Sequence, residues 1–74
     1  MDINYELYKV FYYVGRLGSI TAAAEALCIS QPAVSQAVKQ LEKALNSQLF
    51  IRTQKGVRLT AEGELLFPYV CLLY

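Results

Sequence analysis

A cluster of short polar side chains occupies residues 31 to 36. The Gln31 amide can hydrogen-bond both N6 and N7 of an adenine, and Pro32 offers a rigid apolar surface that suits a thymine methyl group. Ser35 and Gln36 follow one helical turn later, where they can reach base edges or phosphate oxygens. From the helical spacing alone, an ordinary solvated helix start explains these four residues equally well.

Cationic side chains follow this polar cluster along the chain. Lys39 lies two turns after Gln31, where a lysine can neutralise a flanking phosphate, whereas Lys43 lies further along and can simply be solvated. Arg52 and Lys55 could reach the sugar–phosphate backbone or the minor groove of the adjoining turn of a duplex. Plain exposure to solvent is the alternative for these two cations.

The charges of the chain are unevenly distributed, although the net charge is only +1. Residues 31 to 58 carry five Lys or Arg residues against Glu42 alone, a local balance of +4, and the remainder carries −3. We therefore expect positive potential on one part of the molecule, where it attracts polyanions. Thr21 and Ser30 can add hydroxyl and backbone N–H donors for phosphate at helix N-termini, although each is also explained as a helix cap.

The helices that must hold these residues are predicted from apolar spacing and turn signals. Apolar residues at helical spacing predict a first helix that starts at an Asn4 N-cap and ends at Gly18. The alanine-rich residues 22 to 27 predict a short, slim second helix, with Ser19 or Thr21 as its cap.

A third helix is predicted from Gln31 to Leu45, with Ser30 as N-cap and Pro32 in the first turn, where a missing N–H costs nothing. On a helical wheel, an arc of roughly 140° holds its apolar residues, which are Ala33, Val34, Ala37, Val38, Leu41, Ala44 and Leu45. The opposite half carries Gln31, Pro32, Ser35, Gln36, Lys39, Gln40, Glu42 and Lys43. One side of this helix should therefore pack on a core, while the other faces a wet partner.

A hairpin and a fourth helix complete the prediction. Residues 50 to 52 and 57 to 59 predict two short strands, and Gly56 can adopt the positive φ that the turn between them needs. Thr60 can cap a fourth helix, with Glu62 favourably placed in its first turn. Because that helix is apolar nearly all round, it must be covered by the first helix or by a second copy of itself.

Several motifs in this order resemble the DNA-binding domain of LysR-type transcriptional regulators. The run Ser-Gln-Pro-Ala-Val-Ser at residues 30 to 35 matches the hallmark of that family, and Gln-Leu-Glu follows at residues 40 to 42. A Leu-Phe-x-Arg strand at residues 49 to 52 and a Leu-Thr-x-x-Gly helix start at residues 59 to 63 extend the match. The resemblance covers essentially residues 4 to 70.

The resemblance implies a mainly α fold, a winged helix-turn-helix with a three-helix core, a two-stranded β wing and a C-terminal linker and dimerisation helix. The winged domain would span residues 1 to 60, with the helix-turn-helix at about 19 to 45 and the wing at about 50 to 59, and residues 61 to 74 would begin the linker helix. The implied function is sequence-specific binding of double-stranded DNA, with the third helix in the major groove. Two copies would read half-sites of a pseudo-palindrome, associating through Leu65, Leu66, Tyr69, Val70 and Leu73.

The sequence departs from the family pattern at three places. Gln36 stands where the family often has a basic residue, and Asn46 replaces the glycine that usually closes the third helix. The family's proteins continue into an effector domain of two α/β subdomains, whereas this sequence ends at Tyr74 after an unusually apolar run. We therefore expect a fragment or truncated product that binds no small-molecule effector.

Other functional classes fit less well. A chain with 55% hydrophobic and 18% charged residues is too apolar to be disordered. With no histidine, no nucleophile elbow and no phosphate-cradling glycine loop, the sequence predicts neither an enzyme nor a cofactor.

Cys28 and Cys71 lie far apart and offer no zinc site, so both are expected as buried apolar residues. The cytoplasm is the expected location, away from membranes, because there is no signal-peptide pattern and the apolar run at residues 65 to 74 is about half a bilayer span.

The main alternative is a protein-interaction or dimerisation module without DNA binding, because the fourth helix is so apolar. Tyr5, Tyr8, Tyr12 and Tyr13 could also form a stacking platform for single-stranded nucleic acid. Their place on the first helix, away from the basic segment, favours packing against the fourth helix or a second copy instead. Duplex binding that weakens steeply with salt would distinguish a DNA-binding domain from an interaction module.

Overall fold

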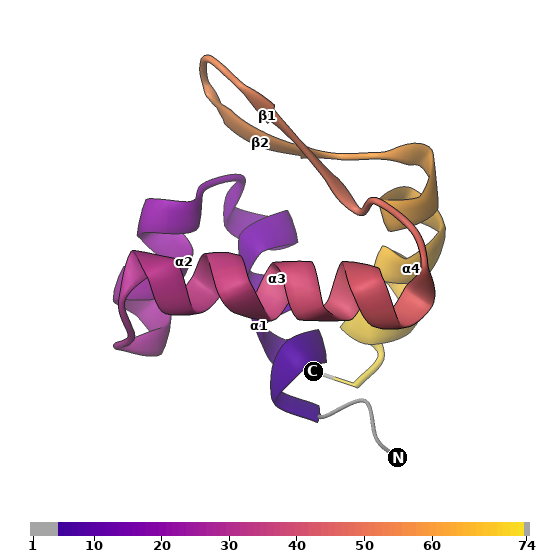
Figure 1. Cartoon of the computed structure of the whole chain (residues 1–74), viewed down its shortest axis with the longest axis horizontal. Coiled ribbons are helices and arrows are strands. Elements are labelled where there is room, and N and C mark those ends of the chain that lie inside the picture. The colour runs from indigo at the N-terminus through magenta and orange to yellow at the C-terminus, as the bar shows by residue number, and fades with distance from the viewer. Residues whose placement is uncertain (1–4, 74) are drawn as a thin grey trace.

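Four helices and one β-hairpin make up residues 5–73, the part of the chain that the computed structural model describes (Figure 1). The helices are α1 (Tyr5–Leu17), α2 (Ile20–Leu27), α3 (Gln31–Leu45) and α4 (Ala61–Cys71), and the strands are β1 (Phe50–Thr53) and β2 (Gly56–Leu59). This order confirms the predicted winged helix-turn-helix. The predicted Asn4 cap and the last residue, Tyr74, lie outside the described residues.

The helix boundaries have local causes. Ser19, Ser30 and Thr60 are N-caps, and the hydroxyl oxygen of each accepts a hydrogen bond from the backbone N–H three residues later. Ser19 is therefore the cap of α2, and Thr21 lies inside that helix. Asn46, which stands in place of the family's glycine, ends α3 in the left-handed conformation, with φ 52°.

The cysteines do not have the predicted environment. Cys28 is exposed and Cys71 is only half-buried, so the expectation that both are buried is wrong. Cys28 ends α2 in the left-handed conformation, with φ 60°, and its backbone N–H donates to the carbonyl groups of Ala24 and Glu25. The turn geometry therefore places this residue at the surface. Within residues 5–73, no group of three or more His, Cys, Asp or Glu side chains could hold a metal ion.

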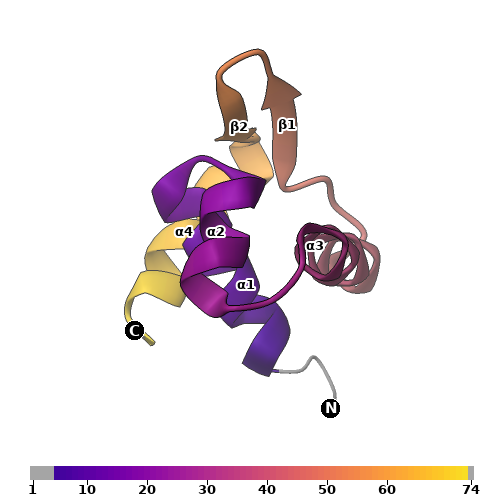
Figure 2. The same cartoon turned by 90° about the vertical axis from the view of Figure 1, so that its left-hand side faces the viewer.

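The core is built around α1. Phe11 is fully buried, and its ring centroid lies 5.2 Å from that of Phe50 and 6.0 Å from that of Phe67. Each helix contributes buried apolar side chains, and the full set is Val10, Phe11, Val14, Ala23, Ala24, Val34, Val38, Leu41, Leu49, Phe50 and Val70. Figure 2 shows α1, α2 and α4 gathered on one side of α3, which is seen end-on. The elements thus enclose a single core and leave one side of α3 uncovered.

The two strands form a wing, residues 50–59, that projects from the helices (Figures 1 and 2). Phe50 pairs with Leu59 and Arg52 with Val57 in an antiparallel register. The wing is tied to the turn between α1 and α2, because the Val57 N–H donates to the Gly18 carbonyl oxygen at 3.0 Å. Gly56 has φ 137°, and a Cβ there would overlap the Gly18 carbonyl oxygen, so only glycine fits this close approach.

The last helix is shorter than predicted and packs one face on α1. It ends at Cys71, and it contains Pro68. The Tyr12 ring stacks on Phe67 with centroids 5.9 Å apart and planes 9° apart, which confirms packing against the fourth helix for this tyrosine. Val70 is only 2% exposed, which corrects its prediction as a contact for a second copy, because this residue belongs to the chain's own core. No helix among the described residues is both long and apolar enough to traverse a bilayer.

Candidate nucleic-acid interface

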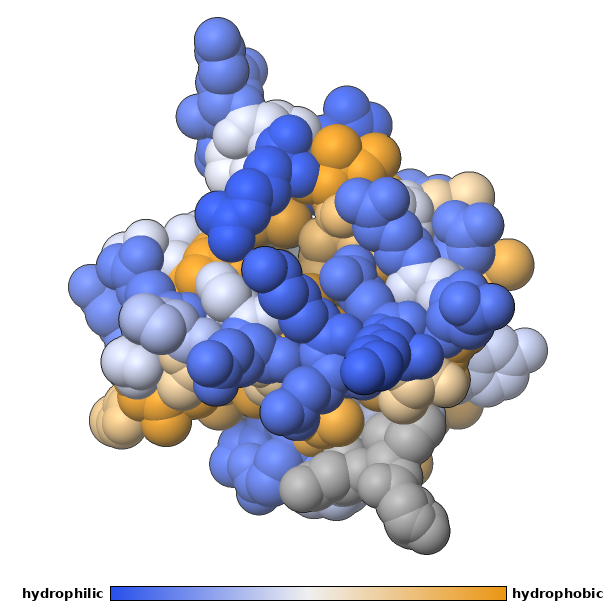
Figure 3. All heavy atoms as spheres, in the orientation of Figure 1, coloured by the Kyte–Doolittle hydropathy of each residue, from blue (hydrophilic) through white to orange (hydrophobic). Residues whose placement is uncertain are grey.

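One face of α3 is polar and open to solvent along its length. Gln31, Pro32, Gln36 and Lys39 are exposed, and Ser35 is half-buried. The buried residues of this helix are Val34, Val38 and Leu41. In Figure 3, hydrophilic atoms form a band along α3, and apolar atoms lie in the hollow between this band and the wing. The predicted division of the helix into an apolar and a polar side is therefore present, except that Ala44 is exposed and that Ser35 and Glu42 are half-buried.

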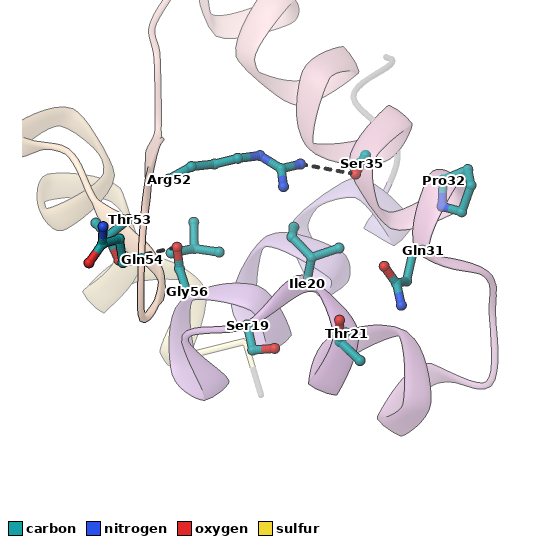
Figure 4. A pocket seen from close by; sticks show the side chains of 11 residues that line it. Ser19, Ile20, Thr21, Gln31, Pro32, Ser35, Arg52, Thr53, Gln54 and Gly56 are labelled. Atoms are coloured by element: carbon teal, nitrogen blue, oxygen red, sulfur yellow. Dashed lines mark hydrogen bonds between the residues drawn. The ribbon is translucent and has the colours of Figure 1, made fainter.

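The start of α3, the start of α2 and the wing enclose an open cleft of about 450 Å³ (Figure 4). Of the predicted site residues, the structure brings five together here, namely Thr21, Gln31, Pro32, Ser35 and Arg52. The remaining lining residues are Ser19, Ile20, Thr53, Gln54, Gly56 and Val57. The cleft therefore presents amide, hydroxyl and guanidinium groups from three elements to a common space.

Arg52 bridges the wing and α3. Its Nη2 donates a long hydrogen bond to Ser35 Oγ, with 3.5 Å between the two atoms. Figure 4 shows this side chain extending from β1 across the cleft toward α3. The guanidinium keeps further N–H donors, because it has five in total. Arg52 can therefore contact another acceptor without leaving Ser35.

Other predicted site residues lie outside this cleft. Lys39 lines an adjacent hollow of about 330 Å³ between α3 and the wing, and Lys55 lies at the hairpin turn. Gln36 is exposed on α3 and lines neither space. Ser30 is exposed at the α3 N-cap, where its Oγ accepts from the Ala33 N–H at 3.2 Å. Its hydroxyl proton remains available to a phosphate oxygen.

Apart from Arg52, which is bonded to Ser35, three cations of α3 and the wing have no competing partner among the described residues. Within residues 5–73, the side chains of Lys39, Lys55 and Arg58 form no hydrogen bond or salt bridge with the protein. Arg16 on α1 differs, because it donates to the Tyr12 hydroxyl at 2.7 Å and this bond raises the pKa of its guanidinium. The wing and α3 therefore carry unengaged positive charge.

Three features of this region are not among the predictions from the sequence. Ser19 and Gln54 line the cleft, and their places just before a helix and inside a hairpin turn could have indicated them. Thr53 Oγ1 accepts from the Lys55 N–H and donates to the Gly56 carbonyl oxygen, each at 3.3 Å, so it organises the hairpin turn. Glu42 was predicted on the solvated half of α3, but its carboxylate contacts backbone N–H groups.

Comparison with known proteins identifies the family. Residues 5–64 match the family described as "Bacterial regulatory helix-turn-helix protein, lysR family". The chain belongs to this family. The LysR-type resemblance predicted from the sequence motifs is therefore confirmed.

Relatives of this LysR-family chain are transcription regulators. The nitrogen assimilation regulatory protein nac of Escherichia coli K12 is 46% identical over 67 residues, which are 90% of this chain and 22% of that protein. The chain thus spans about a fifth of the length of the curated relatives that it matches, because it covers 22% of nac.

Two solved structures with the same fold are described as complexes with DNA. The CbnR_DBD–DNA complex has a TM-score of 0.89 at 30% identity, covering 95% of this chain and 80% of the other. The BenM_DBD/benA site 1 DNA complex has a TM-score of 0.87 at 34% identity, covering 99% of this chain and 83% of the other. The LysR-family winged helix-turn-helix thus extends over nearly the whole chain.

Proposed function

We propose that this chain binds double-stranded DNA sequence-specifically, as the DNA-binding domain of a LysR-type transcriptional regulator. The single observation that carries the proposal is the cleft in which the polar start of α3 meets the wing, with Gln31 and Arg52 on its walls. An α-helix fits the major groove of B-DNA, and a helix-turn-helix reads bases with the first residues of its second helix. We therefore call α3 the recognition helix below.

We assign base contacts to the first two turns of the recognition helix. Gln31 would bond the N6 and N7 atoms of an adenine, and Pro32 would pack against a thymine methyl group. Ser35 and Gln36, one turn later, would contact a base edge or a phosphate oxygen. The exposure of Gln31, Pro32 and Gln36 supports these roles, because a base must reach the side chain without displacing protein.

We assign phosphate contacts to the groups around this helix start. Lys39 and Arg52 flank the hollow between α3 and the wing, and Lys55 lies at the tip of the wing. Thr21 and Ser30 would add hydroxyl donors near the N-termini of α2 and α3. Such contacts fix the register of the protein on the duplex, whereas the base contacts select its sequence.

We further propose that two copies associate through α4 and occupy two half-sites of a pseudo-palindrome. Leu65, Tyr69 and Leu73 are exposed, and Leu66 is half-buried beside them. Leu72, which was not predicted, is 84% exposed and extends this surface. Exposed apolar side chains of this size are typical of an interaction surface.

The relatives' role as regulators supports the remaining assignments. We assign the chain no catalytic role, and we place it in the bacterial cytoplasm, where it can reach the chromosome. An interaction module without DNA binding is the competing function, favoured by the apolar surface of α4. Both functions could use α4, so they differ in what the recognition helix does.

A salt titration tests the proposal. Counterion release gives a slope of about −0.9 in log K against log salt for each phosphate neutralised, so contacts by Lys39, Arg52 and Lys55 predict a slope near −2.7 for each copy. The titration would use fluorescence anisotropy with a labelled duplex selected from a random pool. A duplex of scrambled sequence is the matched control and should bind more weakly with a similar slope. Absence of binding, or a flat salt dependence, would favour the interaction module.

A further inference from the structure

Glu42 is the sole acidic residue among residues 31 to 58, and it is half-buried although its position on the helical wheel predicts a solvated side chain. Its Oε2 accepts the Leu49 N–H at 2.7 Å and the Phe50 N–H at 3.2 Å. Leu49 directly precedes β1, and Phe50 is its first residue. A side chain of the recognition helix therefore holds the base of the wing.

The same short stretch is held from its other side by the start of α4. The Thr60 N–H donates to the Leu49 carbonyl oxygen at 3.0 Å, and Thr60 Oγ1 donates to the Gln48 carbonyl oxygen. Gly63 packs so closely that a Cβ there would overlap the Leu49 carbonyl oxygen. Both backbone polar groups of Leu49 are thus bonded, to Glu42 on one side and to Thr60 on the other.

We propose that Glu42 is a positioning residue for DNA binding, which fixes the distance between the wing and the recognition helix. The inference rests on the proposed function. Phe50 and Arg52 lie on the same face of β1, because side chains alternate along a strand. Anchoring Phe50 therefore places Arg52 across the cleft from α3, where it contacts Ser35. The wing cations and Gln31 can then bind one duplex at the same time. Because the wing is already in place, the wing does not have to become ordered when the duplex binds, which would cost free energy.

An alternative is that Glu42 affects DNA binding mainly through its negative charge. Glu42 lines the hollow that Lys39 and Arg52 also line, so its negative charge opposes phosphate binding. If charge were its main effect, neutralising Glu42 would strengthen DNA binding. If it positions the wing, losing its hydrogen bonds weakens DNA binding. The two explanations therefore predict opposite changes in duplex affinity.

Two substitutions separate the effect of the length of the Glu42 side chain from the effect of its charge. Glu42→Asp keeps the charge but is one methylene shorter, so it cannot keep both bonds, and we expect its duplex affinity to fall about tenfold. Glu42→Gln loses the charge but keeps an acceptor at full reach, so its affinity should stay within about twofold of the unmodified chain. Glu25→Gln is the matched charge control, because Glu25 is exposed on α2. Anisotropy at fixed salt would measure all four proteins.

Amide hydrogen exchange in the DNA-free chain provides a second readout. We expect the Leu49 and Phe50 amides to exchange about tenfold faster in Glu42→Asp and to stay protected in Glu42→Gln.

Unprotected amides in the unmodified chain, or full duplex affinity in a folded Glu42→Asp, would overturn the inference while leaving duplex binding intact. If Glu42→Asp does not fold, Glu42→Gln decides, because tighter binding by that variant supports the charge account. If the unmodified chain binds no duplex, the proposed function itself fails, even where the amides are protected.

Discussion

The recognition-helix face and the outer face of α4 are both uncovered, but they differ in chemistry. The first carries amides, hydroxyls and unengaged cations around a cleft. The second exposes large apolar side chains, with Leu65 73% and Tyr69 72% exposed. The core is complete without either face, since its buried residues come from all four helices and from residues 49 and 50. One small domain can therefore keep two chemically distinct surfaces, one suited to a polyanion and the other to an apolar partner.

The position of α4 explains why its surface is open. Its inner face packs on α1 through Phe67 and buries Val70 in the core, whereas the opposite face has no neighbour within the described chain. Burying an exposed Leu side chain, or one of similar size, at an interface stabilises the assembly by about 1.5–3 kcal/mol. Several such side chains together can drive the association of two copies.

The largest effect should come from breaking the apolar surface with Leu65→Asp. A charge at this exposed position prevents association but leaves the monomer's core intact, because Leu65 makes little contact with its own chain. We expect monomers in sedimentation, and a loss of about 100-fold or more in affinity for a duplex with two half-sites. Leu17→Asp, at another exposed leucine on α1, is the control and should still associate. Identical sedimentation of both variants and the unmodified chain would show that α4 is not the interface.

The next largest effect should come from the polar face, with Gln31→Ala. Losing a bidentate base contact removes about 1–3 kcal/mol of discrimination, so the preference for the selected duplex should fall about 5- to 150-fold. Affinities for the selected duplex and for single-base variants of it would measure this preference. Gln40→Ala is the matched control, since Gln40 is also exposed on α3 but lies further from its start. Equal losses across all sequences would contradict a role in reading bases.

A smaller and sequence-independent effect is expected from Lys39→Ala. One phosphate contact is lost, so all duplexes should bind several-fold more weakly, and the slope of log K against log salt should become shallower by about one. Lys43→Ala, on the same helix and also exposed, should leave the slope unchanged. A change in sequence preference instead of slope would move Lys39 to the base-reading group.

The smallest effect should come from Ser30, where capping and DNA contact can be separated. Ser30→Ala removes the hydrogen bond to the Ala33 N–H and should lower the free energy of unfolding by about 1 kcal/mol, or Tm by about 4–8 °C. Ser30→Asp keeps a capping acceptor, so its Tm should be retained while its charge repels phosphate and weakens duplex binding. Calorimetry and anisotropy would measure the two effects. Unchanged binding by Ser30→Asp would leave Ser30 as a cap alone.

Local signals predicted the recognition helix well. Ser30 and Pro32 mark its start, Asn46 adopts the left-handed conformation that ends it, and the buried residues follow the predicted apolar side. The hairpin was equally readable, because Gly56 marks the turn. The motifs around these signals led to the family.

Contacts between distant segments could not be predicted from such signals. Glu42 lies on the polar half of α3, but the chain at residues 49 and 50 returns to cover it. Arg52 reaches Ser35, which is 17 residues earlier in the sequence. Val70 is buried because α4 turns that face to the core, a choice that an almost uniformly apolar helix does not reveal. The arrangement of elements in space decides each of these cases.

The contrast between the two faces is tested most directly by NMR chemical-shift mapping during titration of the labelled chain with the selected duplex. We predict the largest amide shifts at the start of α3, residues 31–39, and in the wing, residues 50–59, with little change along the exposed face of α4. Shifts concentrated on α4, with α3 and the wing unchanged, would contradict duplex binding by the recognition helix and the wing.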